Sequence, residues 1–69
     1  MTDIPNTAEM NAAAERHPQF LEQLLAMSIR GRERYVRLLA PHVKDATELE
    51  DLRLVHKYAD IVDLARLFR

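Results

Sequence analysis

The sequence contains no cysteine and no tryptophan, and only one glycine and three prolines among its 69 residues. Without cysteine, neither a disulfide nor a thiolate zinc site can stabilise the fold. A chain of this length buries only about 60% of the surface that its unfolded form exposes. Domains this small commonly need a second subunit when disulfides and metals are missing. The composition therefore predicts a single domain over residues 1–69 that forms a homodimer.

Long apolar runs are also absent. No stretch approaches the roughly 18 apolar residues that a membrane-spanning helix needs, and the acidic start MTDIPN lacks the apolar centre of a secretory signal. The content of 48% hydrophobic and 30% charged residues is typical of a folded soluble helical protein, and the net charge of −1 gives no overall attraction to nucleic acid. We therefore expect a cytoplasmic protein that does not enter a membrane.

The residue patterns of catalytic and metal sites are missing as well. His17, His42 and His56 do not share the i, i+4 spacing of a helical metal site. The one serine, Ser28, falls in an apolar stripe and has no adjacent base. No glycine-rich phosphate loop is present either. The sequence thus predicts a protein that is not an enzyme and that binds no cofactor or metal.

Start and stop signals divide the chain into three helical segments. We expect disorder over residues 1–5, a short alanine-rich helix over 7–16, a long helix over 18–40 and a second long helix over 47–68. Pro18 suits the first turn of a helix, and Pro41 cannot continue one. A single glycine, Gly31, costs about 1 kcal/mol inside a helix, so we predict that the segment 18–40 is uninterrupted.

Both long helices carry apolar residues over about half of their circumference, which is too wide for one neighbouring helix to cover. Two such helices joined by a short connection are expected to pack antiparallel as a hairpin, and two hairpins to meet in a four-helix arrangement. The predicted fold class is therefore all-α, a helical hairpin with a short N-terminal helix that dimerises. The predicted core and dimer residues are Leu21, Leu24, Leu25, Ser28, Gly31, Arg32, Tyr35, Leu38, Val55, Tyr58, Ile61 and Val62.

Arg32 is the one charged member of that set. A buried guanidinium without a partner would cost too much free energy. We expect Arg32 to form an intersubunit salt bridge or to lie at the edge of the interface.

Three further arginines, Arg30, Arg34 and Arg37, share one face of the first long helix, and we call them the arginine ridge. The ridge can be a solvated face, since Glu33 can pair with Arg37 at i, i+4. It can also anchor a protein partner, because arginine is enriched at interface hot spots and binds carboxylates through two parallel hydrogen bonds. We expect Met10, on an N-terminal segment that orders with a partner, to extend this site. Nucleic acid is less favoured, because the acidic run 45–51 is expected near the ridge.

The length, the lack of cysteine and the order of the segments resemble those of the small phage-encoded anti-activators. A long helix (Pro18 to Ala40), a proline-marked turn (Ala40-Pro41-His42) and a second long helix (Thr47 to Phe68) carry the resemblance. It implies an inhibitor that binds a bacterial quorum-sensing transcription activator and, for some members, the pilus-assembly ATPase, in the cytoplasm of the host. It assigns no binding residues.

Two other interpretations stay open. One is a DNA-binding or antitoxin-like regulator, whose affinity would fall steeply with salt because each neutralised phosphate releases counterions. The other is an assembly chaperone or subunit.

Overall fold

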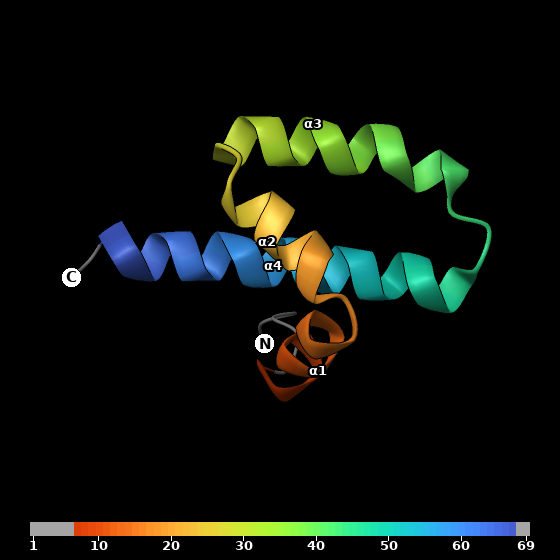
Figure 1. The fold of residues 1–69 in the computed structure, drawn as a ribbon, viewed down its shortest axis with the longest axis horizontal. Helices are drawn as coiled ribbons and strands as arrows, with labels where there is room; N and C mark the ends of the chain where they lie inside the picture. Colours follow the sequence, from red (N-terminus) through yellow and green to blue (C-terminus); the bar gives the residue numbers. More distant parts are fainter. Residues whose placement is uncertain (1–6, 68–69) are drawn as a thin grey trace, which may run out of the picture.

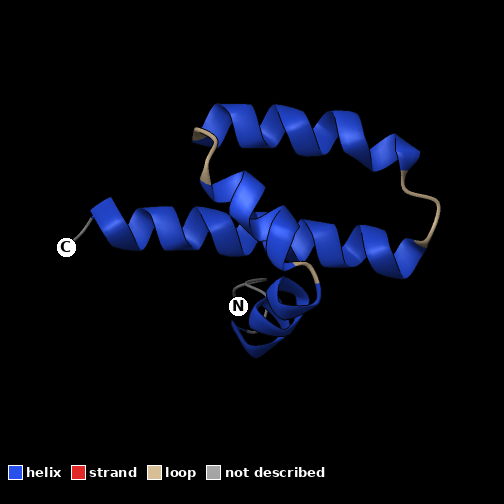
Figure 2. Ribbon diagram, viewed as in Figure 1, coloured by secondary structure: helices blue, strands red, loops and turns tan. Residues whose placement is uncertain are grey.

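The computed structural model describes residues 7–67, and this part of the chain is helical without any strand (Figure 2). Its elements are the α-helices α1 (Thr7–Arg16), α2 (Pro18–Leu25), α3 (Ile29–Leu39) and α4 (Ala46–Leu67), with a 3-10 turn η1 (Ala40–His42). The predicted all-α class is confirmed. The disorder predicted for residues 1–5 falls outside the described residues, as does Phe68 at the predicted end of the last helix.

The longest helix, α4, is the element on which the others pack (Figure 1). α1 and α2 contact it directly, and α3 contacts it while running in the opposite direction along it. The end of α4 projects beyond the other helices (Figure 1). No helix within residues 7–67 has both the length and the apolar character needed to cross a bilayer.

The core lies where α1, α2 and α3 meet the middle of α4. Its buried cluster comprises Ala13, Ala14, Leu24, Val36, Val55 and Ala59. Small side chains on α1 and α4 leave room for close helix packing, and Met10, at 1% exposure, adds the one large apolar side chain of α1. The expectation that Met10 belongs to an exposed partner site is therefore wrong in this fold.

The residues predicted for the core and dimer interface separate into three groups. Leu24, Arg32 and Val55 are fully buried. Six others are half-buried: Leu21, Leu25, Gly31, Tyr35, Tyr58 and Val62. Leu38 and Ile61 are exposed, as is Ser28. The monomer therefore buries much, but not all, of the wide apolar face that the sequence assigns to a second copy.

The predicted uninterrupted helix over 18–40 is wrong, because the chain turns a corner at residues 26–28 between α2 and α3. Ser28 adopts an extended conformation (φ −66, ψ 163), and its hydroxyl accepts a hydrogen bond of 3.1 Å from the Gly31 amide. Ser28 is thus the N-cap of α3 and not a small packing residue inside a helix. Gly31 lies within α3 and does not cause the break.

The start of α4 is capped by Asp45, the first residue of the acidic run 45–51. The Asp45 carboxylate accepts a hydrogen bond of 2.9 Å from the Thr47 amide, and the helix begins at Ala46. A cap of this kind satisfies one of the amides that the first turn of a helix leaves without a partner.

Candidate functional site

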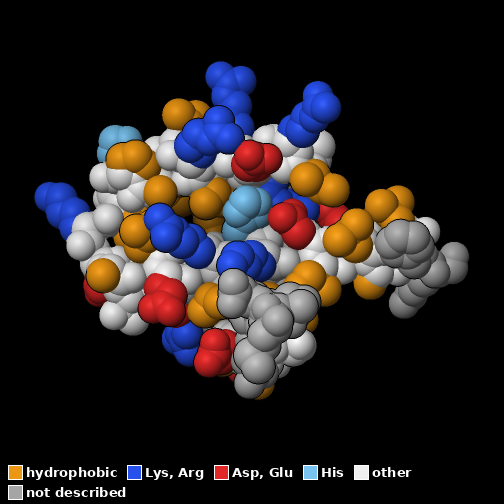
Figure 3. Space-filling view, turned by 180° about the vertical axis from the view of Figure 1, so that it is seen from behind, with side chains coloured by type: hydrophobic (Ala, Val, Ile, Leu, Met, Phe, Trp, Pro, Cys, Tyr) orange, Lys and Arg blue, Asp and Glu red, His pale blue; other side chains and the backbone are white. Residues whose placement is uncertain are grey.

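The arginine ridge lies on the outer face of α3. Arg30, Arg34 and Arg37 are all exposed, and basic side chains project from the edge of the molecule that α3 forms (Figure 3). Arg37 donates a hydrogen bond of 2.9 Å to Glu33, the i, i+4 pair that the sequence suggests. Arg30 and Arg34 form no ion pair with any residue in the range 7–67. Two guanidinium groups are therefore available to an external carboxylate or phosphate.

Exposed apolar side chains accompany the ridge. Leu38, at 62% exposure, follows Arg34 by four positions, so the two side chains lie side by side on the helix. Ile29, at 45% exposure, begins the same helix. Arginine next to large apolar side chains is the composition that protein interfaces favour.

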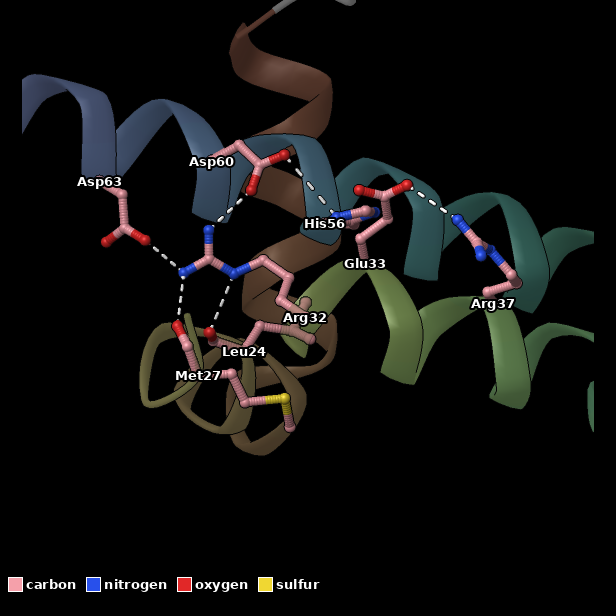
Figure 4. Close-up of polar contacts among 8 residues, drawn as sticks. All are labelled: Leu24, Met27, Arg32, Glu33, Arg37, His56, Asp60 and Asp63. Atoms are coloured by element: carbon pink, nitrogen blue, oxygen red, sulfur yellow. Dashed lines mark hydrogen bonds and ion pairs between the residues drawn. The ribbon is translucent and has the colours of Figure 1, made fainter. Parts of the chain in front are cut away.

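Arg32 points the other way, into the molecule, and its side chain is fully buried (Figure 4). Its Nη1 donates to Asp60 at 2.6 Å, and its Nη2 donates to Asp63 on the next turn of α4. The intersubunit salt bridge expected for Arg32 is therefore wrong, because both carboxylates belong to the same chain. The buried position is tolerated since no buried side-chain nitrogen or oxygen within residues 7–67 lacks a hydrogen-bond partner.

Arg32 also closes the end of α2. Its Nε donates to the Leu24 carbonyl at 3.0 Å, and its Nη2 donates to the Met27 carbonyl at 3.1 Å. Carbonyls at the C-terminal end of a helix lack partners within the helix, and a positive charge there also interacts favourably with the helix dipole. We call Arg32 with Asp60, Asp63 and these two carbonyls the Arg32 clamp.

The electrostatics of the clamp keep Arg32 charged. Burial acts to lower the pKa of the guanidinium, but the hydrogen bonds to Asp63 and Asp60 outweigh it, so the pKa is raised above its ordinary value. The clamp joins α3 to both α2 and α4. The clamp therefore fixes the position of α3, which carries the arginine ridge on its opposite face, relative to α2 and α4.

Neither Asp60 nor Asp63 is among the site residues that the sequence predicts. Their i, i+3 spacing puts the two carboxylates on adjacent turns of one face. The sequence signal for the clamp was therefore this pair of carboxylates together with Arg32, a charged residue inside an apolar stripe. Which of several acidic pairs would meet Arg32 depended on the corner at residues 26–28, which the sequence did not reveal.

A second ionic cluster attaches α1 to α4. Arg16 donates two hydrogen bonds to Asp51, of 2.9 and 2.7 Å, and His17 Nε2 lies 3.3 Å from the same carboxylate. The hydrogen bonds from Arg16 lower the pKa of Asp51, despite the opposing effect of burial, with a smaller contribution from His17. The same interaction raises the pKa of Arg16. In the sequence, Asp51 is notable only as the last residue of the acidic run 45–51.

The other two histidines lie apart from this cluster. His56 is 3.7 Å from Asp60 on α4, and His42 is exposed in η1. Among residues 7–67, no group of three or more His, Cys, Asp or Glu side chains is arranged to hold a metal ion.

Comparison of the chain with protein-family models, with curated proteins and with solved structures finds no match. The candidate site is consequently defined by its geometry alone, as the arginine ridge with Leu38 beside it.

Proposed function

We propose that this protein is a small non-enzymatic inhibitor that binds a bacterial regulator and sequesters it through the arginine ridge. The observation that carries the proposal is the pair of exposed guanidinium groups, Arg30 and Arg34, that have no acidic partner within residues 7–67 and lie beside exposed Leu38. The Arg32 clamp supports the helix that carries them. A rigid support lowers the entropic cost of binding, because fewer groups must be ordered on association.

The surface favours an acidic protein as its ligand. Each free guanidinium can form two parallel hydrogen bonds with one carboxylate, and complementary charge raises the association rate. Leu38 adds an apolar contact that a phosphate backbone would not use. The resemblance to phage-encoded anti-activators suggests the target class, a quorum-sensing transcription activator, with the pilus-assembly ATPase as a second target.

The test compares binding of the parent and of Arg30→Ala/Arg34→Ala/Arg37→Ala to a purified quorum-sensing activator, by calorimetry. We expect the triple substitution to weaken binding by at least roughly tenfold, which corresponds to about 1.4 kcal/mol. Circular dichroism should show unchanged helicity, because exposed helix substitutions usually alter stability by no more than about 0.5 kcal/mol each.

The matched control is Lys44→Ala/Arg53→Ala/Lys57→Ala, which removes three exposed positive charges away from the ridge. It should bind the activator like the parent. If both triple variants bound the activator equally weakly, binding would depend on overall charge only. If the ridge variant bound it as tightly as the parent does, the ridge would be only a solvated face.

Duplex DNA is the competing ligand, since the same three arginines on one helix could contact phosphates. Titration with DNA at several salt concentrations separates the two functions. The DNA-binding regulator would be favoured if DNA bound the parent but not the ridge variant, and if the logarithm of the affinity fell linearly with the logarithm of the salt concentration.

A further inference from the structure

The corner between α2 and α3 replaces backbone hydrogen bonds with side-chain hydrogen bonds. In a continuous helix the Leu24 carbonyl would accept from the Ser28 amide, and the Met27 carbonyl from the Gly31 amide. In the structure Arg32 donates to both carbonyls, and the Gly31 amide donates to the Ser28 hydroxyl. The Leu24 carbonyl also accepts a backbone hydrogen bond of 3.1 Å from the Met27 amide, in a tightened last turn. The side chains of Arg32 and Ser28 thus provide partners for the Met27 carbonyl and the Gly31 amide, and a second donor for the Leu24 carbonyl.

The corner residues themselves contain no helix breaker. Ala26 retains helical angles (φ −78, ψ −13), whereas Ser28 is extended. Alanine and methionine are among the best helix formers, and no proline or glycine occurs between Leu25 and Ile29. The local sequence therefore favours a continuous helix, and tertiary contacts favour the corner.

We propose that this corner is a hinge locked by Arg32, and that release of the lock joins α2 and α3 into one helix over residues 18–39. Joining them carries α1 and α2 away from their own α4, so that they pack on a second copy of the chain. Straightening removes α1 and α2 from the α4 of their own chain, so Ala13, Ala14 and Leu24 lose their packing against Val55 and Ala59. A second straightened copy leaves the same surface of α4 uncovered. Reciprocal exchange of α1–α2 restores the same core in both copies, which is the general basis of domain swapping.

The two states differ in a distance that can be measured. The rings of Phe20 and Tyr35 lie with their centroids 6.1 Å apart across the corner. In one continuous helix residues 20 and 35 would be separated by about 22 Å along the axis, at 1.5 Å per residue. The lack of cysteine allows specific labelling at introduced cysteines nearby.

Spin labels at Gln19→Cys and Leu38→Cys, both exposed positions, report on the hinge. Samples are diluted with unlabelled protein, so that the measured distances are those within one chain. The parent should show only a distance well below the roughly 28 Å expected for a continuous helix. Two variants should release the lock. Arg32→Met removes its donors but keeps an unbranched side chain, and Ser28→Ala removes the cap of α3 and raises helix propensity.

We expect each variant to show a new intrachain distance near 28 Å. Refolding protein labelled only at residue 19 with protein labelled only at residue 38 should then give a short distance between chains. Asp45→Ala is the control, because it removes the cap of α4 without touching the corner, and it should retain the parental distance. Should Arg32→Met fail to fold, Ser28→Ala decides the outcome.

Three results would overturn the proposal. The first is a folded variant with only the parental intrachain distance. The second is a long intrachain distance without a short distance between chains, which would exclude exchange. The third is the same long distance in Asp45→Ala, which would show that general destabilisation opens the corner.

Discussion

At the scale of single residues, Arg32 determines how α2, α3 and α4 are joined. The sequence correctly indicates that a guanidinium in an apolar stripe needs carboxylates, because an unpaired buried charge is very costly. It does not indicate that those carboxylates are Asp60 and Asp63 of the same chain. Their identity follows from the corner at residues 26–28, which aims Arg32 at the second half of α4.

The importance of these carboxylates can be measured with Asp60→Asn/Asp63→Asn. Asparagine keeps an acceptor oxygen, so the substitution removes charge and leaves a fully buried guanidinium without counter-charge. Loss of a buried partner of this kind costs about 3–5 kcal/mol of unfolding free energy, to be measured by urea denaturation. Glu33→Gln, which breaks the exposed pair with Arg37, should cost no more than about 0.5 kcal/mol. Similar costs for the two variants would mean that the clamp contributes little.

At the scale of elements, the local signals in the sequence are sufficient for α1 and for the start of α4. The predicted helix over 7–16 coincides with α1, and Asp45 begins α4 as a cap. The corner between α2 and α3 could not be predicted in the same way. Ala26 and Met27 favour helix, and the contacts that oppose a continuous helix come from the Arg32 side chain, five and eight positions from the carbonyls that it binds. The burial of Met10 depended on how α1 crosses α4, which its short apolar pattern does not specify.

The attachment of α1 to α4 should depend on pH through Asp51. The folded pKa of Asp51 lies below its ordinary value of 3.8, so its ionised form stabilises the fold above pH 3.8, and this stabilisation is lost as pH falls through the lower folded pKa. Asp51→Asn should therefore lower the urea midpoint at neutral pH. Its difference from the parent should shrink below pH 3.8. Glu48→Gln, an exposed acid in the same helix start, is the control. A parent–variant difference that stays constant through this acid range would contradict the assigned role.

At the scale of the whole molecule, the monomer leaves many large aliphatic side chains in water. Those exposed within residues 7–67 are Ile29, Leu38, Ile61, Leu64 and Leu67. Three of them, Ile61, Leu64 and Leu67, belong to the last two turns of α4. A mainly apolar hollow of about 320 Å³, lined in part by Ile29 and Leu67, lies beside this end. For a chain with so small a core, covering this surface with a second copy is the available way to bury more apolar area.

We therefore predict a homodimer that uses the end of α4. Sedimentation equilibrium at micromolar concentration should give about 16 kDa, twice the chain mass of 8.0 kDa. Ile61→Glu/Leu64→Glu should reduce the mass to that of the monomer with helicity retained, because both side chains are exposed and charge opposes their burial. Leu38→Glu, on α3, should remain dimeric, which would place Leu38 outside the dimer interface. A parent protein that sediments as a monomer and unfolds cooperatively would refute dimerisation, and loss of the dimer in Leu38→Glu alone would move the dimer interface to the arginine ridge.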